Sequence, residues 1–310
     1  MITPIHLVYQ NDNNIYFKRE DLIPFSFGGN KARKARYFYK EIERLGCDSV
    51  VTYGSSSSNH CRVVANMAAL RNIPCYIIGP SEASCKTYNS VMMNLFNAHI
   101  QIVEVNQVHD AIDETLAKLK KEGKNPYFIE GGGHGILGTQ AYVDCYNEII
   151  EYEDNNNIHF DYIFFASGTG TTHAGLVCGQ LLNKDNRKII GISIARKNPR
   201  GRQIVVDSIK SYLSNKRINI SKKIVSDATI FLDQYTNDGY ASSNSHIDDT
   251  IKTTLIETGI PLDSTYTGKA YSAMLDIINK QQIADKNILF IHTGGTPLFF
   301  DYLQRFYKTD

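Results

Sequence analysis

The run Phe27-Gly28-Gly29-Asn30-Lys31-Ala32-Arg33-Lys34 decides how the rest of the chain is interpreted. Two glycines stand just ahead of a lysine that opens an amphipathic helix, whose expected apolar stripe is Ala35, Phe38, Ile42 and Leu45. Glycines allow close backbone approach, and a helix start offers unpaired N–H groups and a positive dipole end that favour an anion such as phosphate. A lysine held there beside other cations is expected to have a lowered pKa, which supplies the neutral amine that a Schiff base needs. The alternative is a solvated lysine at an ordinary helix start.

Length, composition and charge indicate a globular enzyme-sized protein. The chain has 310 residues, 42% of them hydrophobic and 21% charged, which is typical of about two domains. The net charge is +1 and there are no long runs of like charge, so the composition indicates no electrostatic attraction to nucleic acid or to an anionic membrane. The first residues lack the pattern of a secretory signal, and no apolar stretch approaches the roughly 18 residues of a membrane span. We therefore expect a cytoplasmic location, with no nucleic-acid or membrane partner.

The cysteines favour reduced thiols. Cysteine occurs six times, at Cys47, Cys61, Cys75, Cys85, Cys145 and Cys178, and no two of these form a Cys-x-x-Cys pair. In a chain of this length without a signal, such residues are expected in or near cores. Neither a disulfide framework nor a zinc site is indicated, and we expect no metal.

Short β-rich runs alternate with helix-length amphipathic segments, a pattern typical of parallel sheets covered by helices. The runs are mostly continuous apolar stretches, as expected when both faces of a sheet are buried. Predicted strands are Ser49–Tyr53, Cys75–Ile78, Ile100–Val105, Tyr127–Ile129, Tyr162–Ala166, Ile189–Ile194 and Ile288–Ile291. A break near residue 145 separates two strand–helix series, and residues 193–202 form a basic connection.

Polar or glycine-rich stretches follow several of these strands, where open α/β sheets bind their ligands. Gly54-Ser55-Ser56-Ser57-Ser58-Asn59-His60 leads into a helix expected to begin near His60. Capping that helix explains one serine but not four, so the turn is a candidate site for an anionic ligand. Glu130-Gly131-Gly132-Gly133-His134-Gly135 is interpreted either as a wall or hinge of a cleft or as a plain loop.

A third stretch has the composition of a phosphate-binding turn. Ser167-Gly168-Thr169-Gly170-Thr171-Thr172-His173-Ala174-Gly175 follows a buried strand and opens a helix, so backbone N–H groups, hydroxyls and a helix dipole converge there. It lacks the Gly-Lys-Ser/Thr ending of a Walker loop, and its spacing misses the dinucleotide fingerprint Gly-x-Gly-x-x-Gly. Two further polar groups, at 263–269 and 292–297, could also face the cleft.

A Schiff-base lysine, a separate phosphate cup and hydroxyl-lined loops together suggest pyridoxal 5′-phosphate (PLP). With these motifs the chain resembles the fold-type-II PLP enzymes, specifically the 1-aminocyclopropane-1-carboxylate (ACC) deaminase/D-cysteine desulfhydrase family. The resemblance extends from about Lys18 to Pro297. Its most specific elements are Lys-Arg-Glu-Asp at 18–21, Gly-Gly-Asn-Lys-x-Arg-Lys at 28–34, Ser-Asn-His at 58–60, Thr-Gly-x-Thr at 169–172 and Asp-x-x-Tyr-x-Gly-Lys at 263–269.

The resemblance implies an α/β fold of two open, mostly parallel twisted sheets with helices on both faces. Residues 1–40 and 144–310 would form a large PLP-binding domain and residues 41–143 a smaller one, which replaces the simple division near residue 145. We also expect a homodimer.

The resemblance also implies roles for individual residues. Lys31 would form the Schiff base, and Asn59 would contact the 3-oxygen of the ring. Ser58 and Tyr266 match the family's active-site serine and tyrosine, and Thr267 stands where the family places the partner of the pyridine nitrogen. The residues expected to hold the phosphate are Lys34, Thr169, Gly170, Thr171 and Thr172. The residues expected to contact substrate are Ser58, Asn59, His60 and Tyr266.

Two positions bear on the reaction. The deaminases of the family carry a glutamate at the position of Thr267, and a hydroxyl cannot supply its charge to the ring nitrogen, which disfavours ring opening. His60 matches the desulfhydrase-like branch. We therefore expect a PLP-dependent lyase that performs β-elimination on a small amino acid such as D-cysteine, giving a 2-oxo acid, ammonia and sulfide.

Three alternatives remain beside this hypothesis. ACC deamination is the alternative within the family, and the Glu130–His134 loop differs from the family's usual loop, which leaves the substrate and its chirality open. A non-catalytic, two-lobed amino-acid-binding protein would have no use for Lys31 together with a phosphate cup. A nicotinamide-dependent oxidoreductase would need the glycine fingerprint that the chain lacks.

Overall fold

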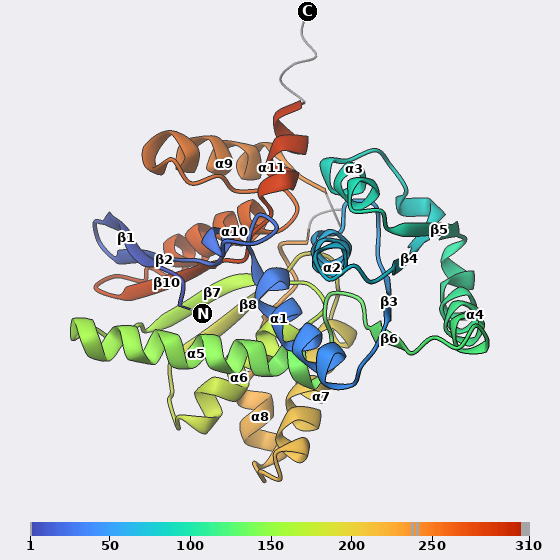
Figure 1. Cartoon of the computed structure of the whole chain (residues 1–310). Coiled ribbons are helices and arrows are strands. Elements are labelled where there is room, and N and C mark those ends of the chain that lie inside the picture. Colours follow the sequence, from blue (N-terminus) through green and yellow to red (C-terminus); the bar gives the residue numbers. More distant parts are fainter. Residues whose placement is uncertain (1, 237–238, 240–241, 305–310) are drawn as a thin grey trace, which may run out of the picture.

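Two sheets organise the protein, whose computed structural model describes residues 2–236, 239 and 242–304 (Figure 1). The larger sheet has the order β1-β2-β10-β7-β8-β9 and comprises β1 (Ile5–Gln10), β2 (Asn14–Arg19), β7 (Tyr162–Ser167), β8 (Lys188–Ser193), β9 (Ile230–Leu232) and β10 (Asn287–His292). The smaller has the order β5-β4-β3-β6 and comprises β3 (Ser49–Tyr53), β4 (Cys75–Pro80), β5 (His99–Val103) and β6 (Pro126–Ile129). Apart from the antiparallel hairpin of β1 and β2, neighbouring strands run parallel. The expected fold class is confirmed.

Helices cover both sheets. Around the smaller sheet lie α1 (Asn30–Arg44), α2 (Asn59–Leu70), α3 (Tyr88–Leu95) and α4 (Val108–Lys121). The remaining helices are α5 (Ile136–Asn156), α6 (Thr171–Leu182), α7 (Arg200–Asn215), α8 (Lys222–Ala228), α9 (Ser245–Thr258), α10 (Thr267–Lys280) and α11 (Thr296–Leu303). In Figure 1, α5 and α6 lie below the larger sheet, and α9 and α10 lie above it.

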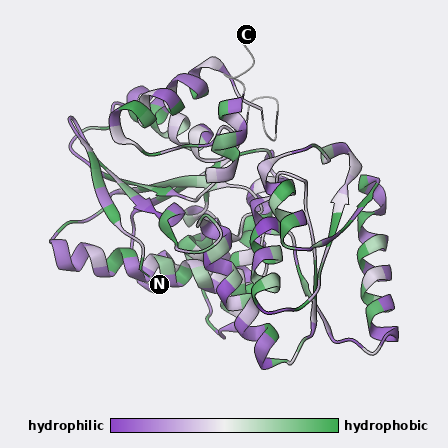
Figure 2. Cartoon of the chain, turned by 45° about the horizontal axis from the view of Figure 1, so that its top comes forward, coloured by the Kyte–Doolittle hydropathy of each residue, from purple (hydrophilic) through white to green (hydrophobic). Residues whose placement is uncertain are grey.

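The central strands of the larger sheet are buried on both faces. In β7, Ile163 and Phe165 pack into the core that α5, α6 and α7 share, whereas Phe164 packs into the core of α9 and α10. Successive side chains of a strand point to opposite faces, so a strand with two covered faces must be apolar throughout. Figure 2 shows this as hydrophobic strands enclosed by helices with one hydrophobic side.

The smaller sheet also packs against helices on both of its faces. Val50 and Ile129 pack against α1 and α2 through residues such as Phe38 and Val64. On the opposite face, Ile78 packs with Ala111 and Ile112 of α4.

The structure departs from the sequence-based expectations in its peripheral elements. Strands β1, β2 and β9 were not predicted, because the hairpin carries many polar residues at the sheet edge and β9 has only 3 residues. β5 ends at Val103, and a 3-10 turn begins at Val105. Helix α5 continues without interruption through residue 145, and β1 and β2 join the sheet of the later strands, so the simple division near 145 is wrong.

Two expectations about burial also need correction. Leu45 lies at the C-terminal cap of α1 and is 44% exposed, so the apolar stripe ends at Ile42. Cys85 is exposed and Cys47 half-buried, whereas the other four cysteines are buried, and all six thiols are free.

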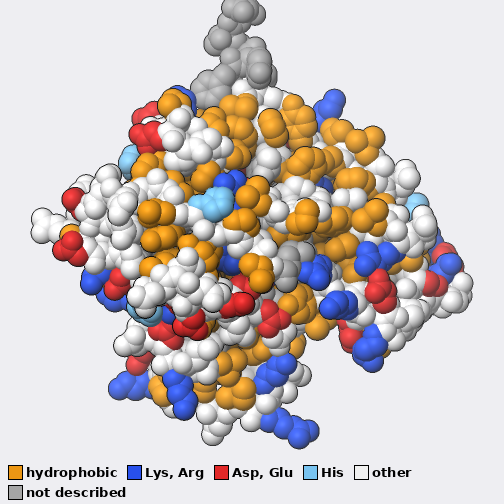
Figure 3. Space-filling view, turned by 60° about the vertical axis from the view of Figure 1, so that its left-hand side comes forward, with side chains coloured by type: hydrophobic (Ala, Val, Ile, Leu, Met, Phe, Trp, Pro, Cys, Tyr) orange, Lys and Arg blue, Asp and Glu red, His pale blue; other side chains and the backbone are white. Residues whose placement is uncertain are grey.

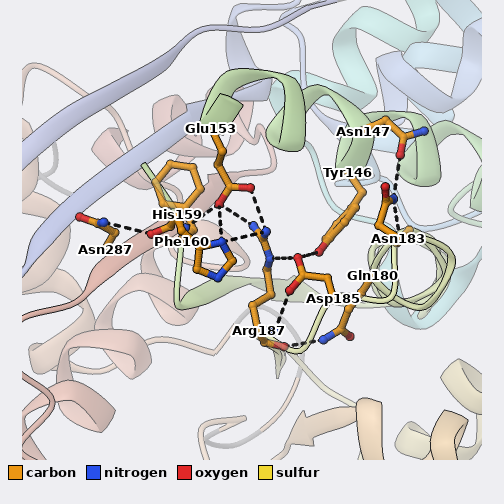
Figure 4. A network of polar contacts seen from close by, with 11 residues as sticks. Tyr146, Asn147, Glu153, His159, Phe160, Gln180, Asn183, Asp185, Arg187 and Asn287 are labelled. Atoms are coloured by element: carbon orange, nitrogen blue, oxygen red, sulfur yellow. Dashed lines mark hydrogen bonds and ion pairs between the residues drawn. The ribbon is translucent and has the colours of Figure 1, made fainter. Parts of the chain in front are cut away.

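A buried ionic network ties α5 to the amino end of β8 (Figure 4). The Arg187 guanidinium donates to both carboxylate oxygens of Glu153, at 2.8 and 2.9 Å, and to Asp185 at 2.5 Å. Tyr146 donates to the same Asp185, and Phe160 N donates to Glu153. Every charge in this network has an opposite partner, and removing one of them would leave a buried charge without compensation.

Candidate active site

The polar loops that follow the strands of both sheets meet in one cleft. A cavity of about 500 Å³ is lined by residues that follow β3, β6, β7 and β8, together with Lys31 and Tyr266. A narrower slot adjoins it and shares Lys31, Gly168 and Tyr266 with the cavity. Residues that complete the slot are Asn30, Asn59, Ala166, Thr293 and Gly294. The carboxyl ends of parallel strands therefore supply the candidate site.

Two glycine pairs in direct contact place Lys31 in the slot. Gly29 caps α1 with φ 91°, and a Cβ there would lie 2.8 Å from the carbonyl oxygen of Thr293. A Cβ on Gly294 would lie 2.6 Å from Gly29 Cα. Asn30 N donates to Thr293 O at 2.9 Å. Only glycine permits this approach, which carries the first turn of α1 against the loop after β10.

Lys31 carries the lowered pKa that the sequence predicts. Burial lowers the pKa of its amine from 10.5 to about 8, so a substantial fraction is neutral near physiological pH. The cause differs from the expected one, since burial rather than neighbouring cations produces the shift. Lys34, one turn along α1, has a pKa well below the usual value because of burial and of the charge on Lys31.

The turn after β7 forms an anion cradle. Gly170 caps α6 with φ 95°, and α6 begins at Thr171. Asn30 Nδ2 donates to Thr172 Oγ1 at 3.1 Å, and Thr171 Oγ1 lies 2.9 Å from His134 Nδ1. The unpaired N–H groups of the helix start, the hydroxyls and the dipole all favour a negative group here.

The Lys34 amine lies beside the wall of this cradle. Its Nζ donates to Gly132 O at 3.4 Å. The glycine loop fits closely against the cradle, because a Cβ on Gly132 would lie 2.5 Å from Thr169 Cγ2. The Glu130–Gly135 stretch therefore forms a wall of the cleft, one of its two interpretations.

The start of α2 presents Ser58 and Asn59 to the site. Ser58 Oγ caps the helix by accepting from Cys61 N at 3.2 Å. Asn59 Oδ1 accepts from Asn89 Nδ2 at 2.9 Å, which orients the Asn59 amide and leaves its N–H groups available in the slot. His60 lines the cavity but is buried, with Nε2 2.9 Å from Thr52 Oγ1. Burial holds its pKa well below 6.5, so the imidazole is neutral.

Tyr266 and Thr267 begin α10 and differ in their surroundings. Tyr266 lines both the cavity and the slot. The Thr267 hydroxyl donates to Asp263 Oδ2 at 2.8 Å and accepts from Asp263 N at 2.9 Å. The threonine that lines the slot is Thr293, whereas Thr267 lies buried behind it. The role expected for Thr267 toward a ring nitrogen remains a prediction.

Several of the lining residues were given no role by the sequence patterns. Asn30 was recognised only as part of the Gly-Gly-Asn-Lys motif, and the others are Tyr53, Ile194, Ala195, Arg196 and Ile204. Arg196 had the clearest signal, because it is a cation directly after a predicted strand. The run of basic residues around it indicated only a connection between elements, and that composition concealed its place at the cavity.

Residues of the Lys-Arg-Glu-Asp run form ion pairs next to the site but do not line it. Lys18 pairs with Glu148 at 2.9 Å, and Arg33 pairs with Glu20 at 2.5 Å and with Glu148 at 2.7 Å. Burial raises the pKa of the Glu20 carboxyl, but Arg33 outweighs it and holds that pKa at about 2. Within the described residues, the one group with metal-ligand geometry is Glu20, Cys145 and Glu148, and its two carboxylates already bind these cations. This buried network ties α1 to β2 and α5.

Comparison with known proteins identifies similar chains over nearly the whole length. A family model described as pyridoxal-phosphate dependent enzyme matches residues 2–294. D-cysteine desulfhydrase of Serratia proteamaculans is 33% identical over 300 residues, covering 93% of this chain and 88% of that protein. D-cysteine desulfhydrase of Yersinia pestis is 33% identical over 296 residues, with the same coverage. The crystal structure of an ACC deaminase homologue superposes with a TM-score of 0.86 at 25% identity, covering 99% of this chain and 96% of that one.

None of the helices in the described ranges is both long enough and apolar enough to span a bilayer.

Proposed function

Because the chain belongs to the pyridoxal-phosphate-dependent enzyme family, we propose that it is a lyase that eliminates the β-substituent of a small amino acid, with D-cysteine as the expected substrate. The observation that carries this proposal is that Lys31 and Thr169, the first residue of the cradle at Thr169–Thr172, line one cavity, which adjoins the slot beside Asn59. A non-catalytic binding protein would have no need for an amine of lowered pKa next to an anion cradle.

The donor set of the cleft fits PLP. The cradle has the chemistry of a phosphate site, and Lys34 lies beside its wall with no ion-pair partner among the described residues. Lys31 supplies the amine for attachment to the aldehyde. The cavity, where it adjoins the slot between the Gly29–Gly294 contact and the start of α2, would hold the ring, with Asn59 donating to its 3-oxygen. Bound PLP would withdraw electrons from the substrate's Cα.

The residues of this chain supply the remaining chemistry. The N–H groups at the start of α2 and the Ser58 hydroxyl would bind the substrate carboxylate. The neutral Lys31 amine would accept the proton from Cα as the Cβ–S bond breaks and the thiolate leaves with its electron pair. Tyr266, which lines both spaces, would position the carboxylate or transfer a proton. Hydrolysis of the remaining fragment gives the 2-oxo acid and ammonia.

ACC deamination is disfavoured by Thr267. Its hydroxyl is already bonded to Asp263, and it carries no negative charge that could hold a ring nitrogen protonated.

The test is to assay the holoenzyme for 2-oxo acid and sulfide with both enantiomers of cysteine and β-chloroalanine, and with ACC. We expect elimination from D-cysteine and β-chloro-D-alanine, and little or no ring opening of ACC. Efficient ring opening without elimination from either enantiomer would contradict the proposal.

We also propose a two-domain division, with residues 1–40 and 144–310 in the large domain and residues 41–143 in the small one. Support comes from the strands, since those between residues 49 and 129 all lie in the smaller sheet and the other described strands lie in the larger one. Helices α1 and α5 pass through the proposed boundaries.

A homodimer is our proposal for the assembly. Figure 3 shows hydrophobic side chains gathered over the upper part of the face that it presents, with charged side chains concentrated below. Exposed hydrophobic residues of the chain include Ile2, Leu7, Leu22, Phe27 and Phe300. Apolar surface of this kind is typical of interfaces. A molar mass of one chain, measured by light scattering, would contradict the homodimer.

The free cysteines support the proposal of a cytoplasmic location.

A further inference from the structure

The roles proposed above leave one cation of the cavity unused, that of Arg196. It lies directly after β8 among the residues that line the cavity with Lys31 and Tyr266. Its position is defined by two contacts: Ser193 Oγ donates to Arg196 O at 2.6 Å, and Arg196 Nη1 donates to Thr169 O at 3.2 Å. The guanidinium is therefore held at the cavity, with Nε and Nη2 bonded to no described protein group.

Arg196 has no compensating charge in the described part of the chain. It forms no ion pair there, and Glu130, the acid that lines the same cavity, lies beyond ion-pair distance. The charged group that most affects it is another cation, Arg200, and the Tyr53 hydroxyl faces it from the smaller sheet. A half-buried guanidinium beside a second cation can form strong, charge-assisted hydrogen bonds with an anion that enters the cavity.

In the proposed function, the other two anions of the reaction already have sites. The cofactor phosphate is assigned to the cradle at the start of α6, and the substrate carboxylate to the start of α2 with Ser58. Arg196 lies on the Thr169 side of the cavity, next to residues of β8 rather than α2. It is thus available to a third negative group.

We propose that Arg196 binds a negatively charged β-substituent, so that the enzyme accepts β-substituted alanines whose substituent already carries a negative charge in the bound substrate, such as a sulfate ester. This inference rests on the proposed elimination. The Cα proton passes to Lys31, the Cβ–O bond breaks with its electron pair moving to oxygen, and sulfate departs. Water then converts the remaining fragment to the 2-oxo acid and ammonia. Arg196 contacts the leaving group, which makes it a residue that determines specificity.

The test compares a charged and a neutral β-substituent in the holoenzyme. The probes are serine O-sulfate and β-chloroalanine, in both enantiomers. In Arg196→Gln, kcat/KM for serine O-sulfate is expected to fall about 10- to 100-fold, the range for loss of a hydrogen bond to a charged group. The fall for β-chloroalanine should be several-fold smaller, so that the ratio of the two kcat/KM values decreases, and the dissociation constant of PLP should stay within about twofold. Arg196→Lys should retain part of the preference, because it keeps the charge without the planar fork.

Arg200→Gln is the matched control. It removes one positive charge near the cavity without removing a lining residue, and it should change both substrates equally and slightly. A similar fall for both probes in Arg196→Gln would overturn the inference, because Arg196 would then act on the common carboxylate. A large loss of PLP affinity would also overturn it, because Arg196 would then serve the phosphate.

Calorimetry separates this inference from the proposed function. Serine O-sulfate should bind the wild-type holoenzyme at least tenfold more tightly than it binds Arg196→Gln, and failure to do so overturns the inference. If the wild-type enzyme eliminates chloride but neither binds nor turns over serine O-sulfate, only the inference fails. If neither substrate reacts, the proposed elimination is contradicted. The difference in affinity for serine O-sulfate between the wild type and Arg196→Gln then still decides the role of Arg196.

Discussion

An arginine lies near each end of β8, and the two differ in whether they have carboxylate partners. Arg187, just before the strand, donates to Glu153 and Asp185, and Tyr146 completes the network (Figure 4). Arg196, just after the strand, donates to one backbone carbonyl and has no carboxylate partner among the described residues. The charge of Arg187 is thus neutralised within the protein. The charge of Arg196 is available to a ligand.

Within one turn of helix α1, cations with and without carboxylate partners occur side by side. Arg33 faces Glu20 and Glu148 and is held fully charged, since burial, which lowers its pKa, is outweighed by the two carboxylates. Lys31 lines the cleft and Lys34 lies buried beside its glycine wall, and burial lowers the pKa of both amines. Ion pairs stabilise the frame, whereas cations without carboxylate partners prepare a site for anions and for a neutral amine. The contrast predicts that substitutions at the two kinds of position affect different measurements.

The largest expected effect is that of Lys31→Ala. Turnover should fall at least about 10³-fold, because the variant loses both the attachment amine and the proton acceptor. The free energy of unfolding should change little. The measurement is 2-oxo acid formation, with Lys40→Ala at the exposed end of α1 as the control.

Attachment itself gives a second measurement for Lys31. Borohydride reduction of the wild-type holoenzyme followed by peptide mapping should locate PLP on Lys31, and label on another lysine would refute the assignment. Because the pKa of Lys31 is lowered to about 8, the neutral amine fraction increases as pH rises toward 8. Attachment of PLP to the apoenzyme should therefore accelerate from pH 6 to pH 8.

Arg187→Met should produce the opposite pattern. It leaves Glu153 and Asp185 buried without their cation, which is expected to lower the free energy of unfolding by about 3–5 kcal/mol. The kcat of the folded variant should stay near the wild-type value. Urea unfolding at saturating PLP measures the first quantity. Arg196→Gln, measured in parallel, should lose less than about 0.5 kcal/mol, and an equal loss in both variants would remove the contrast.

The smallest effect is expected for Thr172→Val. The Thr172 hydroxyl accepts from Asn30 Nδ2, so its own hydrogen is free to donate to phosphate. Loss of that bond should weaken PLP binding by about 1.5–3 kcal/mol, as measured by titration of the apoenzyme. Thr250→Val, a buried site on α9 away from the cleft, should leave PLP affinity unchanged. If Thr171→Val and Thr172→Val combined leave it unchanged as well, these hydroxyls do not bind the phosphate.

The core elements were predictable because their signals are local. Continuous apolar runs such as Tyr162–Ala166 identify strands that are buried on both faces, and all seven predicted strands have counterparts. The turns after these strands were recognised from clusters of glycines and hydroxyl residues at the strand ends. The hairpin β1–β2 was missed because it lies at a sheet edge, where polar residues weaken the pattern.

By itself, the sequence determined the α/β class, the turns at the carboxyl ends of the strands and the lysine at the start of α1. These depend on periodicity and on backbone conformations that glycine permits within a few residues. Only the tertiary structure decided which charges are paired. Arg33 and Glu148 are far apart in the chain, and so are Arg187 and Glu153, and each meets its partner through helix packing. Arg196 meets none of the described carboxylates, because β8 delivers it to the edge of the sheet where the cleft opens. Whether a cation stabilises the fold or awaits a ligand is thus set by long-range packing, which no local pattern records.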